Sequence, residues 1–194
     1  ALVRRAGVVR VNTILQLFAS ARALSTHIRP SGNRLAIVTN GGGPGVMATD
    51  LAVDLGVRMA ELSPATLAKL DGVLPASWSR ANPLDIIGDA TAERYRAAVD
   101  ACLADGGVDG VLVMLTPQAM TRPTEVAGSV IDVAKASSKP VLTCWMGEAQ
   151  VHEGRRLFKQ AGIPYFTTPE PAVEVFSFLS AFYDNQRQLM QTPG

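Results

Sequence analysis

The 194-residue sequence predicts an α/β fold in which a parallel sheet lies between two layers of helices. Five short β-rich runs alternate with helical patterns of ~10–15 residues, which is typical of crossovers between parallel strands. The run 111–115 is continuously hydrophobic, as expected for a strand that is buried on both faces. A glycine-rich turn joins the first predicted strand to the helix that follows it.

The individual elements follow from hydrophobic periodicity and from helix start signals. Apolar residues repeat at helical spacing over 11–24, and a polar connector with Pro30 and Gly32 then leads to the first strand. Ser63 followed by Pro64 marks another helix start. The predicted strands are 34–39, 57–62, 110–115, 140–145 and 163–167. The predicted helices are 11–24, 45–55, 63–74, 91–104, 123–136, 150–161 and 171–190.

Five parallel strands of this kind are most often arranged as in flavodoxin, with the sheet order 2-1-3-4-5. We therefore expect a flavodoxin-like three-layer sandwich with an added N-terminal helix. The expected organisation is a helix and linker at 1–33, the flavodoxin-like domain at 34–170, and a C-terminal helix and tail at 171–194 that lead to a next domain. Because Ala1 is preceded by neither an initiator Met nor a signal-peptide pattern, we expect a cytoplasmic piece of a longer polypeptide.

The composition argues against several classes of function. A hydrophobic content of 47%, a charged content of 18% and a formal net charge of +1 predict neither disorder nor nucleic-acid binding. No apolar run approaches the ~20 residues of a membrane-spanning helix. Cys102 and Cys144 lack metal-site spacing, so we expect buried, reduced thiols and no metal. We expect Trp78 and Trp145 in the core, which leaves no stacking platform for FMN.

The turn at 40–45, with the sequence Asn-Gly-Gly-Gly-Pro-Gly, is the most informative motif. A glycine-rich connection between a strand and a helix exposes backbone N–H groups at the positive end of the helix dipole, which suits a phosphoryl group. The spacing matches neither the dinucleotide fingerprint nor the P-loop, so the backbone and the dipole alone would hold the anion. The alternative is a tight turn whose glycines only allow strand and helix to pack closely.

In the predicted topology, ligands bind beyond the carboxyl ends of the strands. The glycine turn shares that rim with the loops 82–91, 116–123 and 146–150. The loop 82–91 brings a second helix N-terminus, although Asp89 and Thr91 could be plain helix caps and Asp85 a turn-forming acid. We predict transient phosphate binding by residues of two loops, namely Asn40, Gly41, Gly42, Gly43, Gly45, Gly88, Asp89, Ala90 and Thr91.

Segments along nearly the whole chain resemble the ligase domain of NDP-forming acyl-CoA synthetases. This superfamily includes succinyl-CoA synthetase and ADP-forming acetyl-CoA synthetase. The similar segments are 40–50, 82–85, 88–91, 139–142, 162–164 and 168–170. The opening segment 6–11 resembles the one that, in the fused acetate-type enzymes, follows the domain bearing the phosphorylated histidine.

The resemblance implies a reaction in three steps. Acyl-CoA and phosphate give an acyl phosphate, a histidine takes the phosphoryl group, and the phosphohistidine delivers it to a nucleoside diphosphate in an ATP-grasp domain. The phosphohistidine is held between two helix N-termini from two flavodoxin-like domains, and the helix after 40–45 would be one of them. CoA, and ADP or ATP with Mg, would bind to the CoA-binding and ATP-grasp domains of the parent, and this chain would hold no cofactor firmly.

The two histidines of the chain do not match the phosphorylated position of the family. His27 lies in the predicted linker and His152 in a charged helical segment, and we interpret both as ordinary surface residues. The phosphorylated histidine would lie upstream of Ala1. We therefore expect the isolated chain to be inactive as an enzyme.

A second resemblance leaves an alternative open. The segments 144–148, 155–158, 183–189 and 192–193 resemble the same domain in bacterial protein lysine acetyltransferases. Those proteins append a GNAT domain to a synthetase-like region that is commonly inactive and serves in regulation and assembly. The alternative function is thus that of a regulatory or assembly domain.

The apolar stripes of the first and last helices indicate contacts with partners. They need burial, either on the sheet of their own chain, on partner domains of the parent, or in a homodimer of the isolated chain. The stripes consist of Leu15, Leu17 and Phe18 in the first helix and Phe176, Phe178, Leu179 and Phe182 in the last.

Overall fold

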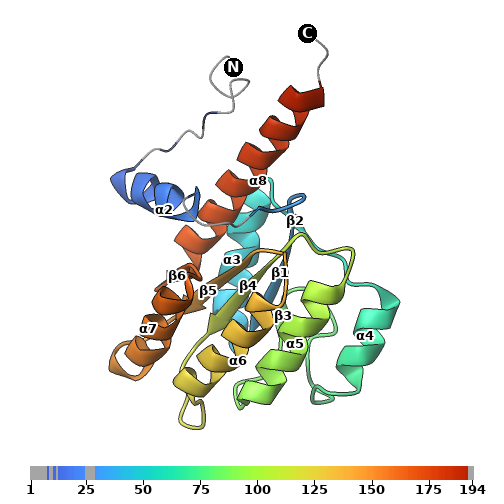
Figure 1. Cartoon of the computed structure of the whole chain (residues 1–194). Helices are drawn as coiled ribbons and strands as arrows, with labels where there is room; N and C mark the ends of the chain where they lie inside the picture. Colours follow the sequence, from blue (N-terminus) through green and yellow to red (C-terminus); the bar gives the residue numbers. More distant parts are fainter. Residues whose placement is uncertain (1–7, 9–10, 12, 25–28, 192–194) are drawn as a thin grey trace.

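A six-stranded parallel sheet forms the centre of the molecule, with helices on both faces (Figure 1). The computed structural model describes residues 8, 11, 13–24 and 29–191. The strands are β1 (Arg34–Thr39), β2 (Arg58–Met59), β3 (Leu84–Asp85), β4 (Gly110–Leu115), β5 (Val141–Trp145) and β6 (Tyr165–Phe166).

The strand order is β2-β1-β4-β5-β6, with β3 paired to β1 outside this path. The predicted order of five strands is therefore confirmed, but the strand count was wrong because the expected loop 82–91 contains β3. Residues 34–35 of β1 pair with β2, whereas residues 38–39 pair with β3. Two short strands thus share one edge of β1.

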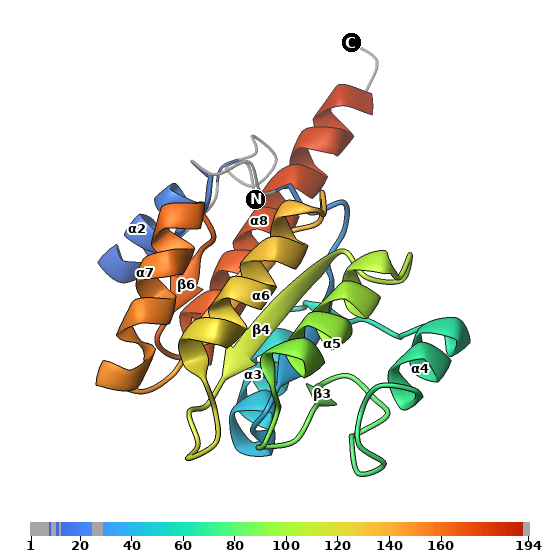
Figure 2. The same cartoon turned by 60° about the horizontal axis from the view of Figure 1, so that its bottom comes forward.

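The helices divide between the two faces of the sheet. They are α2 (Ile14–Leu24), α3 (Gly42–Asp54), α4 (Pro64–Asp71), α5 (Ala92–Ala104), α6 (Pro123–Lys135), α7 (His152–Ala161), which follows a 3-10 turn (Ala149–Val151), and α8 (Pro169–Gln191). Helices α4 to α7 cover one face, while α3 and α8 cover the other (Figures 1 and 2). Ser63 caps α4 as predicted, since its side chain accepts a hydrogen bond from the Thr66 N–H.

The alternation of side chains along β1 supplies both halves of the core. Ala36 and Val38 join the cluster under α4 to α7, whereas Leu35 and Ile37 join the cluster under α3 and α8. The expectation that both tryptophans lie in the core is confirmed. Both cysteines are free and buried, and burial raises the pKa of each thiol to about 12.

Helix α8 begins at Pro169, two residues before the predicted start, and its first half belongs to the core. Phe176 and Leu179 of its predicted apolar stripe are buried against the sheet, whereas Phe178 and Phe182 are half-buried. Its C-terminal half extends beyond the ends at which the strands begin (Figure 1). None of the helices in the described part of the chain is long and apolar enough to span a bilayer.

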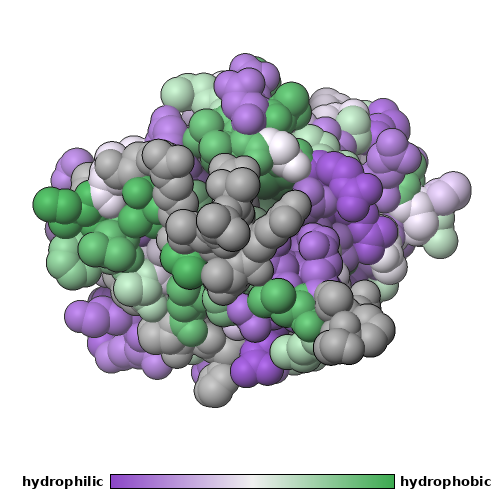
Figure 3. Space-filling view, turned by 90° about the horizontal axis from the view of Figure 1, so that it is seen from above, coloured by the Kyte–Doolittle hydropathy of each residue, from purple (hydrophilic) through white to green (hydrophobic). Residues whose placement is uncertain are grey.

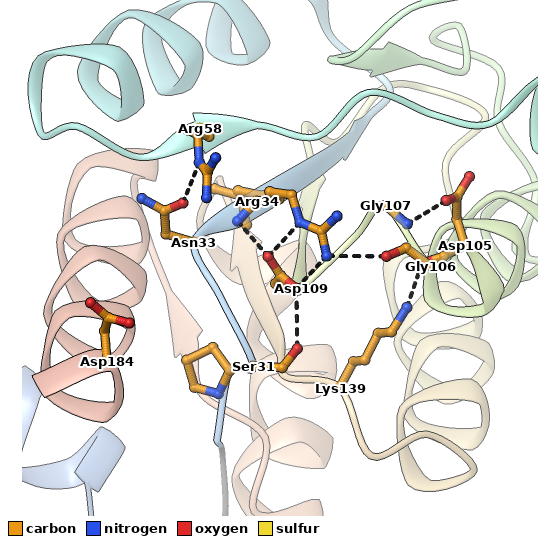
Figure 4. Close-up of polar contacts among 12 residues, drawn as sticks. Ser31, Asn33, Arg34, Arg58, Asp105, Gly106, Gly107, Asp109, Lys139 and Asp184 are labelled. Carbon is orange, nitrogen blue, oxygen red and sulfur yellow. Dashed lines mark hydrogen bonds and ion pairs between the residues drawn. The ribbon is translucent and has the colours of Figure 1, made fainter. Parts of the chain in front are cut away.

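A polar cluster ties together the beginnings of β1 and β4 (Figure 4). The Asp109 carboxylate accepts two hydrogen bonds from the Arg34 guanidinium, both at 2.8 Å, and one from the Arg34 backbone N–H at 3.0 Å. Ser31 Oγ donates a further bond to the same carboxylate. These donors hold the pKa of Asp109 at about 2, with the Arg34 side chain contributing most. This cluster lies at the opposite end of the strands from the glycine turn.

Candidate functional site

The candidate site lies where the carboxyl ends of β1, β3 and β4 meet the start of α3. Figure 2 brings this end of the sheet forward. The glycine turn follows β1, the loop 86–91 follows β3, and the loop 116–122 follows β4. Parallel strands place these three connections on one rim, as the sequence predicted.

Helix α3 begins three residues earlier than we predicted. Gly41 is the N-cap residue and Gly42 is the first helical residue, so the run 43–45 lies in the first turn of the helix rather than in a loop before it. The prediction was wrong because glycine and proline were taken as signs of a turn. The first turn tolerates Pro44, since N–H groups there have no partner within the helix.

Two of the predicted phosphate-binding amides are unpaired. The Gly41 N–H donates to Thr39 Oγ1 at 3.0 Å, and the Gly45 N–H donates to the Gly41 carbonyl oxygen at 3.3 Å. Among the described residues, nothing accepts a hydrogen bond from the N–H groups of Gly42 and Gly43. These two donors lie at the positive end of a 13-residue helix, where a negatively charged group is favoured.

The steric role of the glycines differs from one position to the next. A Cβ atom on Gly41 would lie 2.9 Å from Thr116 Oγ1, and one on Gly45 would lie 3.0 Å from Thr39 Cγ2. A Cβ atom on Gly43 would meet nothing within 4 Å. The close-packing interpretation therefore accounts for Gly41 and Gly45, and it does not account for Gly43.

The Asn40 side chain serves the fold. It is buried, and its carboxamide forms two hydrogen bonds of 2.8 Å with the backbone N–H and carbonyl oxygen of Thr116. These bonds join the end of β1 to the end of β4 immediately before the glycine turn. Phosphate binding by Asn40 remains a prediction, and its side-chain carboxamide is already paired with Thr116.

The loop 86–91 is held in place by its own residues and by α5. Thr91 Oγ1 accepts from the Arg94 N–H as the N-cap of α5, so Thr91 rather than Asp89 is the cap. Asp89 forms an ion pair with Arg94, and this hydrogen bond lowers the pKa of Asp89. The Ala90 N–H donates to the Ile87 carbonyl oxygen at 3.0 Å.

The side chain of Gln118, from the loop after β4, lies against Gly88. A Cβ atom on Gly88 would approach Gln118 Oε1 to 2.5 Å, so a larger residue at position 88 would require the flexible end of the Gln118 side chain to move. Gln118 was absent from our predicted site, and no local pattern marks it, because the contact joins loops that are 30 residues apart. The roles of Gly88, Asp89, Ala90 and Thr91 in phosphate binding remain predictions.

The carboxylate of Asp85 lies beside the start of α3. Its Oδ1 accepts a hydrogen bond from the Ile87 N–H at 2.9 Å, and its Oδ2 is 3.2 Å from the position of a Cβ atom on Gly42. Ile87 adopts a left-handed conformation with φ of 71°, which is rare for a β-branched residue. The hydrogen bond from the Ile87 N–H agrees with the interpretation of Asp85 as a turn-forming acid, and the structure in addition brings its carboxylate beside Gly42 at the start of α3.

A large cavity lies elsewhere and is not the candidate site. It has a volume of about 810 Å³ between α8 and residues 55–58, at the end where the strands begin. Its guanidinium groups already have partners: Arg58 Nε donates to Asn33 Oδ1 at 2.8 Å, and Arg187 bonds Pro30 and Asp184. Anion binding there would compete with these contacts.

One of the two histidines lies in the described part of the chain, just after the loop that follows β5 on this rim. His152 is exposed at the first residue of α7. His27 lies outside the described residues.

Comparison with known proteins places this chain in a protein family. Residues 35–191 match the Ligase-CoA domain family. ADP-forming acetate–CoA ligase I of Archaeoglobus fulgidus is 39% identical over 179 residues, which are 92% of this chain and 25% of the relative. ADP-forming 4-hydroxybutyrate–CoA ligase of Nitrosopumilus maritimus is 32% identical over 184 residues, which are 95% of this chain and 26% of the relative.

A solved structure agrees with these sequence matches. The apo form of the dinucleotide-forming acetyl-coenzyme A synthetase 1 of Ca. Korarchaeum cryptofilum superposes with a TM-score of 0.90 and 31% identity. The superposition covers 99% of this chain and 42% of that chain. This chain therefore spans about a quarter of the length of the two curated relatives and less than half of the solved chain.

Proposed function

This chain belongs to the Ligase-CoA domain family, and from that membership we propose that it works as the CoA-ligase domain of an ADP-forming acyl-CoA synthetase of the acetate–CoA ligase type. The family match over residues 35–191 is the observation that carries the proposal. The 39% identity to an ADP-forming acetate–CoA ligase supports it.

Within that reaction, the start of α3 stabilises charge on the phosphoryl group during its transfer through a histidine of another domain. The unpaired N–H groups of Gly42 and Gly43 support this role, because preorganised backbone donors and a helix dipole favour developing negative charge without rearrangement. The Korarchaeum relative has also been solved in complex with phosphate and ADP, and this supports phosphate and ADP as ligands of the synthetase proposed here.

The remaining ligands bind to other domains of the synthetase. Phosphate binds to this chain transiently, whereas CoA and the nucleotide with Mg bind to the CoA-binding and ATP-grasp domains. The length of the relatives supports this division, since this chain accounts for only about a quarter of each.

The alternative is a regulatory domain of a protein lysine acetyltransferase. The relatives reported above are ligases, and they favour the synthetase over this alternative.

The test is ATP formation from acetyl-CoA, ADP and phosphate by the complete gene product. Gly42→Val should lower kcat by about 100-fold, because the added side chain crowds Asp85 and shields the amide from the phosphoryl group. The matched control is Gly43→Ala, whose new methyl group meets nothing within 4 Å. If the wild-type protein forms no ATP from acetyl-CoA, ADP and phosphate, the proposed function is rejected.

A second readout uses the 194-residue chain alone. Titration with phosphate should shift the NMR signals of the Gly42 and Gly43 amides, and Gly42→Val should abolish the shift. Electron density for sulfate or phosphate at the start of α3 in a crystal would also support anion binding at this position. Amide signals that stay unchanged at millimolar phosphate would reject the anion-binding role.

A further inference from the structure

We propose that Asp85 makes the start of α3 selective for phosphoryl anions that retain a P–OH group, and that it excludes sulfate. The unpaired N–H groups of Gly42 and Gly43, together with the Asp85 carboxylate, are hereafter called the α3 site. The inference rests on the proposed function and deepens it, because it names the chemical form of the phosphoryl group that this site accepts.

The two amides of the α3 site cannot by themselves distinguish phosphate from sulfate. Both anions are tetrahedral, have similar sizes and present oxygens that accept hydrogen bonds, and the positive end of a helix dipole favours either of them. At neutral pH phosphate carries at least one P–OH group, whereas sulfate carries no proton. Selectivity between them therefore requires a group that responds to this proton.

The carboxylate of Asp85 lies where it can make this distinction. Its Oδ2 is 3.2 Å from the position of a Cβ atom on Gly42, which places it within about 6 Å of the Gly42 nitrogen. Hydrogen bonds of about 2.9 Å to the amide and about 2.7 Å to the carboxylate fit this separation when an anion lies between the two groups. One tetrahedral anion can therefore contact both.

The Asp85 side chain is fixed, and one of its two oxygens is free. Oδ1 accepts a hydrogen bond of 2.9 Å from the Ile87 N–H, the Asp85 N–H donates to Ser79 Oγ at 3.0 Å, and Asp85 pairs with Thr39 in the sheet. Among the described residues, no group donates to Oδ2 and no cation forms an ion pair with Asp85. Oδ2 is thus a preorganised acceptor.

The chemistry of a carboxylate gives the selectivity its direction. An ionised carboxylate accepts hydrogen bonds and donates none. A P–OH group donates to Oδ2 in a short, charge-assisted hydrogen bond, and this bond offsets part of the charge repulsion. Sulfate presents only acceptors, so its approach brings two negative groups together without a donor between them. Asp85 therefore acts as a repulsive element that the proton of a phosphoryl group relieves.

A second observation indicates a polar ligand at this position. Thr116 Oγ1 is a buried side-chain atom without a hydrogen-bond partner in the described part of the chain. It lies 2.9 Å from the position of a Cβ atom on Gly41, the N-cap residue of α3. Buried hydroxyls are normally paired, so an unpaired one beside two unpaired amides is typical of a site whose hydrogen bonding a ligand completes.

Two arginines that attract anions lie away from the α3 site. Arg58 and Arg187 line the cavity between α8 and residues 55–58, at the end where the strands begin. Figure 3 views the molecule from this end, whereas Figure 2 brings the opposite end, with the start of α3, forward. The amide signals of Gly42 and Gly43 therefore report on the α3 site and not on anions near these guanidinium groups.

Titration of the 194-residue chain with three anions tests the inference. The NMR signals of the Gly42 and Gly43 amides are followed at pH 7 and constant ionic strength during addition of phosphate, sulfate or monofluorophosphate. The Kd for sulfate should be at least about tenfold higher than that for phosphate. Monofluorophosphate keeps the phosphorus atom and the double negative charge but has fluorine in place of the hydroxyl group, so it should bind as weakly as sulfate.

Two variants separate the carboxylate from the overall charge of the chain. Asp85→Asn should bring the three Kd values to within about twofold of one another, because the asparagine Nδ2 donates to any of the anions. The matched control is Asp50→Asn, which removes the same charge from an exposed position further along α3 and should keep the preference for phosphate. The amide spectra of both variants also show whether the fold is retained.

The wild-type measurement alone can overturn the inference. Equal Kd values for phosphate and sulfate would reject selection by Asp85 and leave the proposed function standing, as would tight binding of monofluorophosphate. Loss of the preference in Asp50→Asn would assign it to overall charge. Amide signals that respond to none of the anions would reject both the inference and the anion-binding role. A complete gene product that lacks synthetase activity, together with a phosphate-selective α3 site, would reject only the proposed function.

Discussion

The side-chain oxygen of Asn82 accepts a hydrogen bond of 2.9 Å from the backbone N–H of Ile37, in the middle of β1. The Asn82 Nδ2 group donates to the carbonyl oxygens of Leu35 and Ala60, at 2.8 and 3.0 Å. The carboxamide thus replaces a strand backbone in the gap between β2 and β3, which pair with the two ends of the same edge. Because β3 follows two residues later, this contact also brings Asp85 to the start of α3.

Replacing Asn82 should strongly destabilise the fold. Asn82→Ala removes three hydrogen bonds and leaves the buried Ile37 N–H without a partner, so we expect the free energy of unfolding to fall by about 2–4 kcal/mol. Urea denaturation followed by circular dichroism measures this change. Asn185→Ala is the control and should change the free energy by less than about 0.5 kcal/mol. Equal free energies of unfolding for the two variants would contradict the proposed role of the Asn82 carboxamide in holding the edge of β1.

The two glycines that flank Pro44 should respond oppositely to alanine. Gly45→Ala places a methyl group 3.0 Å from Thr39 Cγ2 in a buried position, and should cost about 1–2 kcal/mol. Gly43→Ala adds a methyl group in open space, and should be neutral or stabilising by up to about 1 kcal/mol. Thermal unfolding of both variants provides the comparison. A Gly45→Ala protein that is more stable than Gly43→Ala would show that the packing at Gly45 is loose.

Neutralising Asp85 should strengthen phosphate binding by the isolated chain. Its carboxylate lies beside Gly42 and repels an anion at the unpaired amides, so Asp85→Asn should lower the Kd for phosphate at least about threefold. The asparagine oxygen can still accept the hydrogen bond from Ile87, which preserves the loop. Phosphate titration followed by the NMR signals of Gly42 and Gly43 measures the effect. Unchanged or weaker binding would place the anion away from Asp85.

The ion pair between Asp109 and Arg34 should make stability depend on acid pH. The pKa of Asp109 is about 2 in the fold and 3.8 ordinarily. Its contribution is therefore complete above pH ~4 and is lost as the pH falls towards 2. Asp109→Asn should lower the free energy of unfolding by about 2 kcal/mol at pH 7 and by much less near pH 2.

Urea unfolding at several pH values tests this dependence. Asp132→Asn is a suitable control, because Asp132 is exposed and its contact with Arg96 is long, at 3.5 Å. The control should change stability little at either pH. If Asp109→Asn lowers the free energy of unfolding by the same amount at pH 7 and at pH 2, the charge of the carboxylate is not the cause of the loss.

The isolated 194-residue chain should show no synthetase activity. The phosphorylated histidine and the nucleotide and CoA sites are all proposed to lie on other domains. A coupled assay for CoA-dependent ADP release with acetate and ATP should therefore read at background. Clear turnover would show that the catalytic histidine lies within this chain.

Much of the fold was predictable because its signals are local. Hydrophobic runs located the five main strands, and the alternation with helices indicated the parallel order 2-1-3-4-5, which is confirmed. Ser63 and Thr91 are the caps that their positions suggested, because a cap depends on residues three positions apart. The expectation of buried tryptophans and cysteines also held, since apolar surroundings along the chain indicate burial.

The tertiary structure alone decided the details of the candidate site. β3 exists because the Asn82 side chain and the free edge of β1 meet across 45 residues of sequence, and no local pattern records that contact. The start of α3 at Gly42 and the approach of Asp85 likewise depend on how neighbouring strand ends align in space. An N–H group is known to be unpaired only once all of its possible partners have been placed in the fold. For this reason the sequence predicted the glycine turn but did not predict that the N–H groups of Gly42 and Gly43 would be the unpaired ones.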